Sequence, residues 1–189
     1  MKYTGSRKFT QHPKNTVGIL ITNLGTPAAP TKAALKIYLR EFLSDPRVIE
    51  IPRFVWWFIL NLIILNIRPA RSAEAYSTVW TEEGSPLLFH TINQAEGLKA
   101  ALSSKYGKEI AVGFGMRYGE PSIESAIKEL ESTGIQKLLV LPLYPQYSGP
   151  TTGSTFDAIA KFFVKQRWIP EVRFVSSYHD HPAYIEALA

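Results

Sequence analysis

Residues 17–24 of the chain read VGILITNL, and this run ends at Gly25. The run is short, apolar and rich in β-branched residues, which is typical of a strand buried on both faces of a parallel sheet. Residues 110–114 (IAVGF) and 137–144 (KLLVLPLY) repeat the pattern, and residues 173–177 (RFVSS) form a weaker fourth run. The sequence therefore predicts four strands.

Helical patterns lie between these runs. Apolar side chains recur at helical spacing over residues 31–43, 88–105, 122–132 and 155–165. Strand–helix–strand alternation with short connections predicts a parallel sheet that is covered by helices on both faces. The predicted fold class is α/β, with three layers and a doubly wound sheet.

Ligands of such sheets bind outside the carboxyl ends of the strands. Three segments follow directly on predicted strands, namely residues 23–27, 115–119 and 143–148. Because parallel strands end on one side of a sheet, we expect these segments to meet. The first contains a glycine turn but no G-x-G-x-x-G fingerprint, so a nucleotide-dependent enzyme is a poorly supported alternative.

One long insertion interrupts the alternation. Roughly 85 residues separate the first two strands, far more than one crossover helix needs. Within them, residues 54–67 read FVWWFILNLIILNI, a run of 14 residues where a bilayer span needs about 20. The run is either a buried core helix or an exposed apolar surface. Because Arg47, Arg53, Arg68 and Arg71 flank it, we favour an interfacial surface that touches anionic lipid or a greasy ligand.

The net charge and the absence of cysteine limit the classes of ligand and the cellular compartments that the chain fits. A net charge of +5 fits an acidic ligand, an anionic membrane surface or nucleic acid, but no long basic run supports nucleic acid. The chain has no cysteine, which excludes a disulfide, a thiolate zinc site and an iron–sulfur cluster within this segment. This fits a reducing, cytoplasmic setting. Residues 1–15 are polar and basic, and we expect a loosely held tail there.

Two histidines are the obvious metal candidates. His179 and His181 alternate, so they would share one face of a strand and could chelate an ion. Pro182 follows directly, however, and proline is favoured at the first turn of a helix. We therefore expect His181 to begin a C-terminal helix instead of binding a metal.

Aromatic and polar side chains gather after the third strand. They are Tyr144, Gln146, Tyr147 and Ser148. Flat aromatic ligands bind to such a wall, with ring faces for stacking and hydroxyl or amide groups at the rim. Arg117 and Tyr118 follow the second strand, and an arginine can pair with carboxylates at the edge of a tetrapyrrole. The alternative is that all of these are surface residues with local hydrogen bonds.

Several motifs in order are similar to those of ferrochelatases. They are residues 23–27 (NLGTP), 42–49 (FLSDPRVI), 68–86 with its GSP ending, 113–118 (GFGMRY) and 141–154 (LPLYPQYSGPTTGS). The resemblance runs from about residue 17 to the C-terminus. It implies a chelatase-like fold of two Rossmann-like domains with the porphyrin between them. This chain would supply the first domain, residues 16–178, and the start of a second, residues 179–189.

The resemblance also implies a function. Ferrochelatases insert Fe²⁺ into protoporphyrin IX to form protohaem, the last step of haem biosynthesis. The insertion, about residues 47–86, resembles the family's lip, which closes over the porphyrin and contacts the membrane. Its contact residues would be Trp56, Trp57, Phe58, Leu60 and Ile63. The long apolar lip favours protoporphyrin over coproporphyrin.

Residue by residue, further porphyrin contacts carry over. Arg68, Tyr76 and Ser85 match porphyrin-contacting positions, Arg117 and Tyr118 match pocket residues behind the ring, and Leu24 matches a position that faces the metal side of the macrocycle. The family's metal-insertion histidine and glutamate match nothing here, so catalytic and metal-binding residues are expected beyond Ala189. The expectations are therefore an inactive isolated chain, porphyrin and Fe²⁺ as substrates with no covalently bound cofactor, and peripheral contact at the inner face of a membrane. Self-association through the open cleft or lip is expected, and the alternative function is a non-catalytic porphyrin-binding or membrane-associated module.

Overall fold

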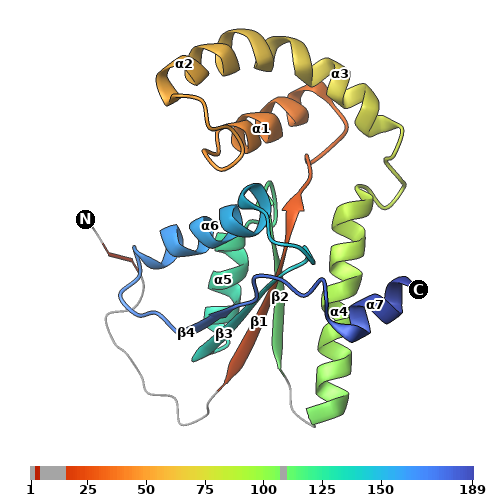
Figure 1. Ribbon diagram of the computed structural model, residues 1–189, viewed down its shortest axis with the longest axis vertical. Helices are drawn as coiled ribbons and strands as arrows, with labels where there is room; N and C mark the ends of the chain where they lie inside the picture. The colour runs from red at the N-terminus through yellow and green to blue at the C-terminus, as the bar shows by residue number, and fades with distance from the viewer. Residues whose placement is uncertain (1–2, 5–15, 107–109) are drawn as a thin grey trace.

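The computed structural model describes residues 3–4, 16–106 and 110–189. Its centre is a parallel sheet of four strands: β1 (Val17–Gly25), β2 (Ala111–Tyr118), β3 (Lys137–Pro142) and β4 (Glu171–Phe174). The strand order is β2-β1-β3-β4 (Figure 1). Helices cover both faces, which confirms the predicted α/β fold class.

One face of the sheet carries the larger core. Helices α5 (Ile123–Ser132) and α6 (Ser154–Phe163) pack there against Leu20, Leu138 and Val140, all three fully or almost fully buried. The Ser122 hydroxyl accepts a hydrogen bond from the Ser125 N–H and so begins α5. Alternate residues of β3 are buried on this side, as a strand covered by a helix requires.

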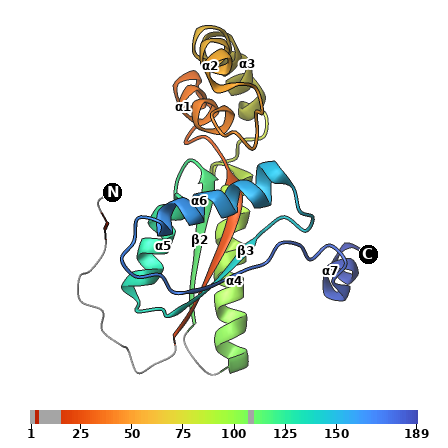
Figure 2. The same cartoon turned by 60° about the vertical axis from the view of Figure 1, so that its left-hand side comes forward.

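The other face is covered by the long helix α4 (Pro86–Tyr106). Ala95 of this helix packs against Ile19 and Ile21 of β1 in a second core cluster. Figure 1 and Figure 2 show α4 on one side of the sheet and α5 and α6 on the other. The three layers therefore correspond to the predicted arrangement.

Several boundaries differ from the sequence prediction. Strand β2 continues to Tyr118, so Arg117 and Tyr118 belong to the strand and not to the loop after it. Strand β4 begins two residues early, at Glu171. A short π-helical segment, η2 (Gly149–Gly153), precedes α6. In the predicted tail, Thr4 pairs with the main chain at Lys165 and Arg167, so the chain is held at that residue; residues 1–2 and 5–15 lie outside the described residues.

The insertion forms a helical layer beyond the carboxyl ends of the strands. Helix α1 (Lys32–Leu43) is followed by α2 (Arg53–Phe58), the π-helix η1 (Ile59–Ile64) and α3 (Leu65–Ser77). These last three join into one helix, Arg53–Ser77, which we call the lip helix. In Figure 1 and Figure 2, α1 and the lip helix lie together past the arrowhead of β1.

The helix that contains the apolar run extends well beyond residues 54–67. The lip helix has 25 residues, so by length and composition it could cross a membrane, although its mean hydropathy reaches only 1.2 over the best window. One side of it packs on α1, where Trp56, Leu60 and Leu65 are buried. Packing of one face against the protein favours a helix that lies on a surface.

The lip helix has a second, exposed face. Its apolar side chains there are Phe54, Val55, Trp57, Phe58, Leu62, Ile63 and Ile67. Trp57 is 57% exposed and Ile63 is 51% exposed, whereas Trp56 is 7% exposed and Leu60 is 3% exposed. Of the five predicted contact residues of the lip, Trp56 and Leu60 therefore lie on the buried side, because successive helical residues point to different sides.

Candidate functional site

The carboxyl ends of β1, β2 and β3 meet under the insertion. Gly25 at the end of β1 is in register with Tyr118 at the end of β2, and Thr22 is in register with Pro142 of β3. From β1 the chain passes to β2 on one side, and later to β3 on the other side of β1. The crevice beside β1 is thus the topological switch point, where open α/β sheets bind their ligands.

Aromatic and apolar side chains fill the space between this edge and the lip helix. We call them the edge cluster: Leu24, Tyr38, Phe42, Tyr76 and Tyr118. The Phe42 ring lies edge-on to Tyr118 with centroids 5.1 Å apart, and Tyr38 lies 6.1 Å from Phe42 and 6.4 Å from Tyr76. Three predicted porphyrin contacts, Leu24, Tyr76 and Tyr118, are thereby brought together from three elements.

A buried carboxylate organises the floor of this cluster. Asp45 follows α1, and its side chain is only 4% exposed. Its Oδ2 accepts hydrogen bonds from Arg117 Nη2 at 2.6 Å, from Tyr118 Oη at 2.8 Å and from Ser154 Oγ at 2.5 Å. Its Oδ1 accepts the Arg47 N–H at 2.8 Å. A buried charge needs partners of this kind, and here it has four.

The protonation states follow from these contacts. Burial alone would raise the pKa of Asp45, but the hydrogen bonds from Ser154, Arg47 and Tyr118 and the Arg117 charge together lower that pKa below its ordinary value. Burial raises the pKa of Tyr118 to about 12. Near neutral pH, Asp45 is therefore an anion, and Tyr118 is a neutral phenol that donates to it.

Arg117 lies behind the edge cluster, where internal partners hold its guanidinium. Its Nε donates to Ser154 O at 3.0 Å and to Ser154 Oγ at 2.6 Å, its Nη2 pairs with Asp45, and the guanidinium carbon lies 4.4 Å from the Tyr118 ring centroid. The guanidinium is occupied by internal partners, contrary to the expectation that it offers a fork to porphyrin carboxylates. It supports Tyr118 instead, behind the cluster.

The predicted wall after β3 divides into an inner and an outer part. Tyr144 is partly buried, and its Oη has no hydrogen-bond partner among the residues that the structure describes. Burial raises the pKa of Tyr144, and the nearby Tyr118 adds to this shift. Gln146 is exposed, Tyr147 is 58% exposed and Ser148 is half-buried. The outer residues thus leave ring and amide surface accessible beside the switch point.

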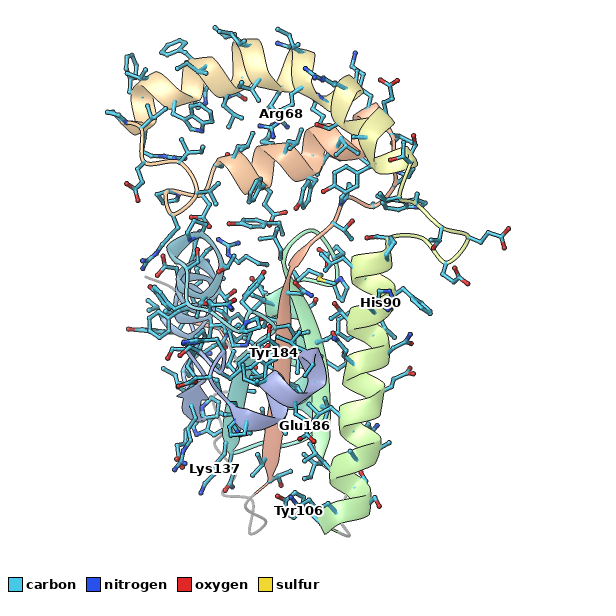
Figure 3. All side chains as sticks on the ribbon, turned by 45° about the vertical axis from the view of Figure 1, so that its right-hand side comes forward. Arg68, His90, Tyr106, Lys137, Tyr184 and Glu186 are labelled. Carbon is cyan, nitrogen blue, oxygen red and sulfur yellow. The ribbon has the colours of Figure 1, made fainter. Side chains whose placement is uncertain are left out.

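The two remaining predicted contacts lie at the sides of the cluster. Arg68 is exposed on the lip helix (Figure 3). Ser85 is 6% exposed, and its main-chain oxygen accepts from the Phe89 N–H in the first turn of α4. Ser85 also lines a groove of about 610 Å³ together with Thr26, Tyr38 and Trp80. Arg68 is therefore accessible to an anionic ligand, while the Ser85 side chain is reached only from this groove.

His181 begins a helix, as the sequence predicts. His181 precedes α7 (Pro182–Leu188), and its Nδ1 accepts from the Ala183 N–H at 3.3 Å. Within residues 3–4, 16–106 and 110–189, no group of three or more His, Cys, Asp or Glu side chains could hold a metal ion. His90, His179 and His181 are all exposed, and none belongs to the edge cluster.

Sequence reasoning missed the role of Asp45 and Ser154. Both stand in family motifs, residues 42–49 and 141–154, but neither residue was singled out there. A usable signal was present, because a carboxylate between the apolar residues of α1 and an apolar helix is often buried and then needs a cation. The partner itself, 72 positions away, could not be identified from the sequence.

Comparison with known proteins agrees with this geometry. The family model described as ferrochelatase matches residues 16–189. The chain is 60% identical over 189 residues to the ferrochelatase of Pseudoalteromonas atlantica, 59% to that of Alcanivorax borkumensis and 53% to that of Thioalkalivibrio sulfidiphilus. Each match covers 100% of this chain and 52%, 55% and 51% of the respective relative, so the chain spans about half of their length. The chain belongs to the ferrochelatase family.

Proposed function

We propose that this chain is the half of a ferrochelatase that grips the porphyrin, and that the complete enzyme inserts Fe²⁺ into protoporphyrin IX to form protohaem. Family membership and the names of its relatives support the activity. The observation that carries the assignment to this half is the edge cluster, which places Leu24, Tyr76 and Tyr118 together at the topological switch point. Beside this packed cluster, the groove of about 610 Å³ lined by Thr26, Tyr38, Trp80 and Ser85 offers aromatic and apolar surface of the kind that suits a large flat ring.

Metal insertion needs a group that accepts protons from the porphyrin, and we assign that group to another part of the enzyme. As the metal enters, a porphyrin must lose two pyrrole N–H protons, and a bent ring exposes its nitrogen lone pairs better than a flat one. The residues of this chain would hold one face of the ring and exclude water from it. A neutral imidazole is suited to accept the protons, but the described histidines lie outside the edge cluster. As the family resemblance implies, we assign the base to the part of the longer enzyme that this chain does not span.

The lip supports a second part of the proposal. Its exposed face combines Phe54, Trp57, Phe58 and Leu62 with the flanking Arg53, and Arg68 and Arg71 follow along the same helix. Apolar side chains with flanking arginines bind the surface of an anionic bilayer. We assign the protein to the cytoplasm, with peripheral contact at the inner face of a membrane. The alternative to a membrane is a second copy of this chain, which would cover the same face by self-association.

Porphyrin binding is tested by fluorescence titration of the chain with protoporphyrin IX. Tyr147→Ala removes an exposed ring from the wall, and we expect it to weaken binding by about threefold to tenfold, the value of one aromatic contact. Tyr106→Ala is the matched control, because Tyr106 is equally exposed at the far end of α4 (Figure 3). Saturable binding of NAD with no response to porphyrin would overturn the proposal.

Metal insertion is tested anaerobically with Zn²⁺ or Fe²⁺ and protoporphyrin IX, by following the absorbance of the metalloporphyrin. We expect no rate above the protein-free control for this chain alone. A rate that disappears on His179→Ala or His181→Ala would show that this half carries its own metal chemistry. Insertion by the full-length protein, with none by this half, would distinguish the enzyme from a porphyrin carrier.

A further inference from the structure

A short segment, residues 44–52, leads into the lip helix, which also packs along α1 and continues at its other end toward α4. This segment joins the end of α1 to the first turn of the lip helix. Two of its side chains, Asp45 and Arg47, reach across to the sheet edge and to α6. We call Asp45, Arg47 and their partners Arg117, Ser154 and Asp157 the clasp.

The clasp has a buried arm and an exposed arm. In the buried arm, Asp45 accepts from Arg117, Tyr118 and Ser154 as described above. In the exposed arm, Arg47 Nε and Nη2 donate to the two carboxylate oxygens of Asp157 at 2.7 Å and 2.9 Å. The Arg47 and Asp157 side chains are 41% and 45% exposed. Such a two-pronged pair fixes orientation as well as distance.

The lip helix in turn holds the residues just before the clasp. Trp56 Nε1 donates to the main-chain oxygen of Leu43 at 2.6 Å in a buried contact, and Arg53 Nη2 donates to that of Ser44. These two hydrogen bonds tie the first turn of the lip helix to Leu43 and Ser44, the residues next to Asp45. A displacement of Asp45 from the sheet edge would carry the lip helix with it.

The far side of the clasp belongs to the porphyrin wall. Ser154 and Asp157 lie in the first turn of α6, which the segment η2 joins to the wall residues ending at Ser148. The Ser148 main-chain oxygen accepts from the Thr151 and Gly153 N–H groups, so this connection is itself hydrogen-bonded. The clasp thus ties the lip to the wall across the switch point.

We propose that Asp45 and Arg47 are positioning residues that set how far the lip opens over the porphyrin wall. The buried arm defines the closed position and also aligns Tyr118. The exposed Arg47–Asp157 pair makes a smaller contribution to the same position. Salt weakens this pair, because solvent ions screen accessible charges. The effect on porphyrin binding rests on the proposed function. The effect on the position of the lip does not, because it can be measured on the protein without porphyrin.

The absence of cysteine allows a direct measurement of that position. Spin labels at Ile67→Cys on the lip helix and Glu129→Cys on α5 occupy exposed sites on two different layers. In the chain without porphyrin, we expect one narrow distance distribution. Arg47→Ala should broaden it and shift it to longer distances, and high salt should produce the same change in the parent but no further change in Arg47→Ala.

Charge reversal separates positioning from stability. Asp157→Arg alone should broaden the distribution as Arg47→Ala does, and the double variant Arg47→Asp with Asp157→Arg should restore it. Lys128→Ala is the matched control, since it breaks the exposed Lys128–Glu124 pair on α5, which touches neither the lip nor the wall. If the distribution of every Arg47 and Asp157 variant equals that of the parent, the clasp does not set the lip.

Porphyrin affinity is measured separately on the same variants. Arg47→Ala should weaken protoporphyrin binding by up to about fivefold, the range of a surface ion pair, and the charge-reversed double variant should recover it. Asp45→Asn should change both the spin-label distances and the porphyrin affinity more than Arg47→Ala does. If Asp45→Asn does not fold, the Arg47 and Asp157 variants still test whether the clasp sets the position of the lip. If the variants change the spin-label distances but no protein, parent or variant, binds porphyrin, the role of the clasp is supported and the proposed function is refuted.

Discussion

Gly25 and Tyr118 end neighbouring strands in register, and a Cβ atom on Gly25 would lie 1.8 Å from the main-chain oxygen of Tyr118. The φ angle of Gly25 is +103°, a value that other residues rarely adopt. This close approach brings Leu24 beside Tyr118 at the floor of the edge cluster. Strand pairing at the switch point therefore depends on a position without a side chain.

Gly25→Ala should destabilise the protein by about 3 kcal/mol or more, because it adds both a clash and backbone strain. Urea unfolding measures the change. Gly97→Ala is the control, since Gly97 lies in α4 and a Cβ atom added there would meet nothing within 4 Å, so helix propensity should stabilise this variant by about 0.5–1 kcal/mol. Equal unfolding midpoints for the two variants would contradict this account.

Tyr118 and Tyr144 offer a matched pair of phenols. Tyr118→Phe removes a donor to the buried Asp45 carboxylate and should cost about 1.5–3 kcal/mol. Tyr144→Phe removes a hydroxyl with no partner among the described residues, so stability should stay level or rise by up to about 1 kcal/mol. Unfolding free energies from urea titrations test both. A marked loss in Tyr144→Phe would reveal a partner for its hydroxyl.

Trp56 and Trp57 are neighbours in sequence, but Trp56 lies on the buried side of the lip helix and Trp57 on the exposed side. Trp56→Ala should cost about 3–5 kcal/mol of stability, because the ring is buried and its indole donates to Leu43. Trp57→Ala should change stability by less than about 0.5 kcal/mol. It should weaken binding to vesicles of phosphatidylglycerol and phosphatidylcholine by about tenfold, as measured by co-sedimentation. Unchanged vesicle binding by Trp57→Ala would argue against a membrane-facing lip.

Asp45 predicts a specific loss of stability in acid. Its pKa in the folded protein lies below the unfolded value of about 4, so its contribution is complete above about pH 4 and is lost as the pH falls through the folded pKa. The difference in unfolding free energy between the parent and Asp45→Asn should therefore be constant near neutral pH and shrink below about pH 4.

Glu131 provides a control of opposite sign. Burial raises its pKa, so its charged form opposes folding above the unfolded pKa, and Glu131→Gln should stabilise the protein at neutral pH but not in acid. Urea titrations between pH 7 and pH 3 measure both variants. A difference between the parent and Asp45→Asn that grows as the pH falls would mean that Asp45 is not held as an anion.

Local signals in the sequence determined the layers of this protein. Residues 17–24 and 137–144 identify themselves as buried strands because a strand covered on both faces is apolar throughout. The helix beginning at Ser122 is marked by a capping residue and an apolar stripe. Parallel strands then place the ends of β1, β2 and β3 at one edge whatever the detailed packing is, which is why the meeting of these three strand ends could be predicted.

Only the tertiary structure decided how the side chains at that edge are used. Arg117 was expected to pair with carboxylates of a ligand, yet its guanidinium donates hydrogen bonds to Asp45 and Ser154. These partners lie 72 and 37 positions away in the sequence. Trp56 and Trp57 are identical in type and adjacent in sequence, and contact with α1 alone makes one core and the other surface. Periodicity and caps are properties of neighbouring residues, whereas ion pairs and burial depend on which distant segments the fold brings within a few ångströms.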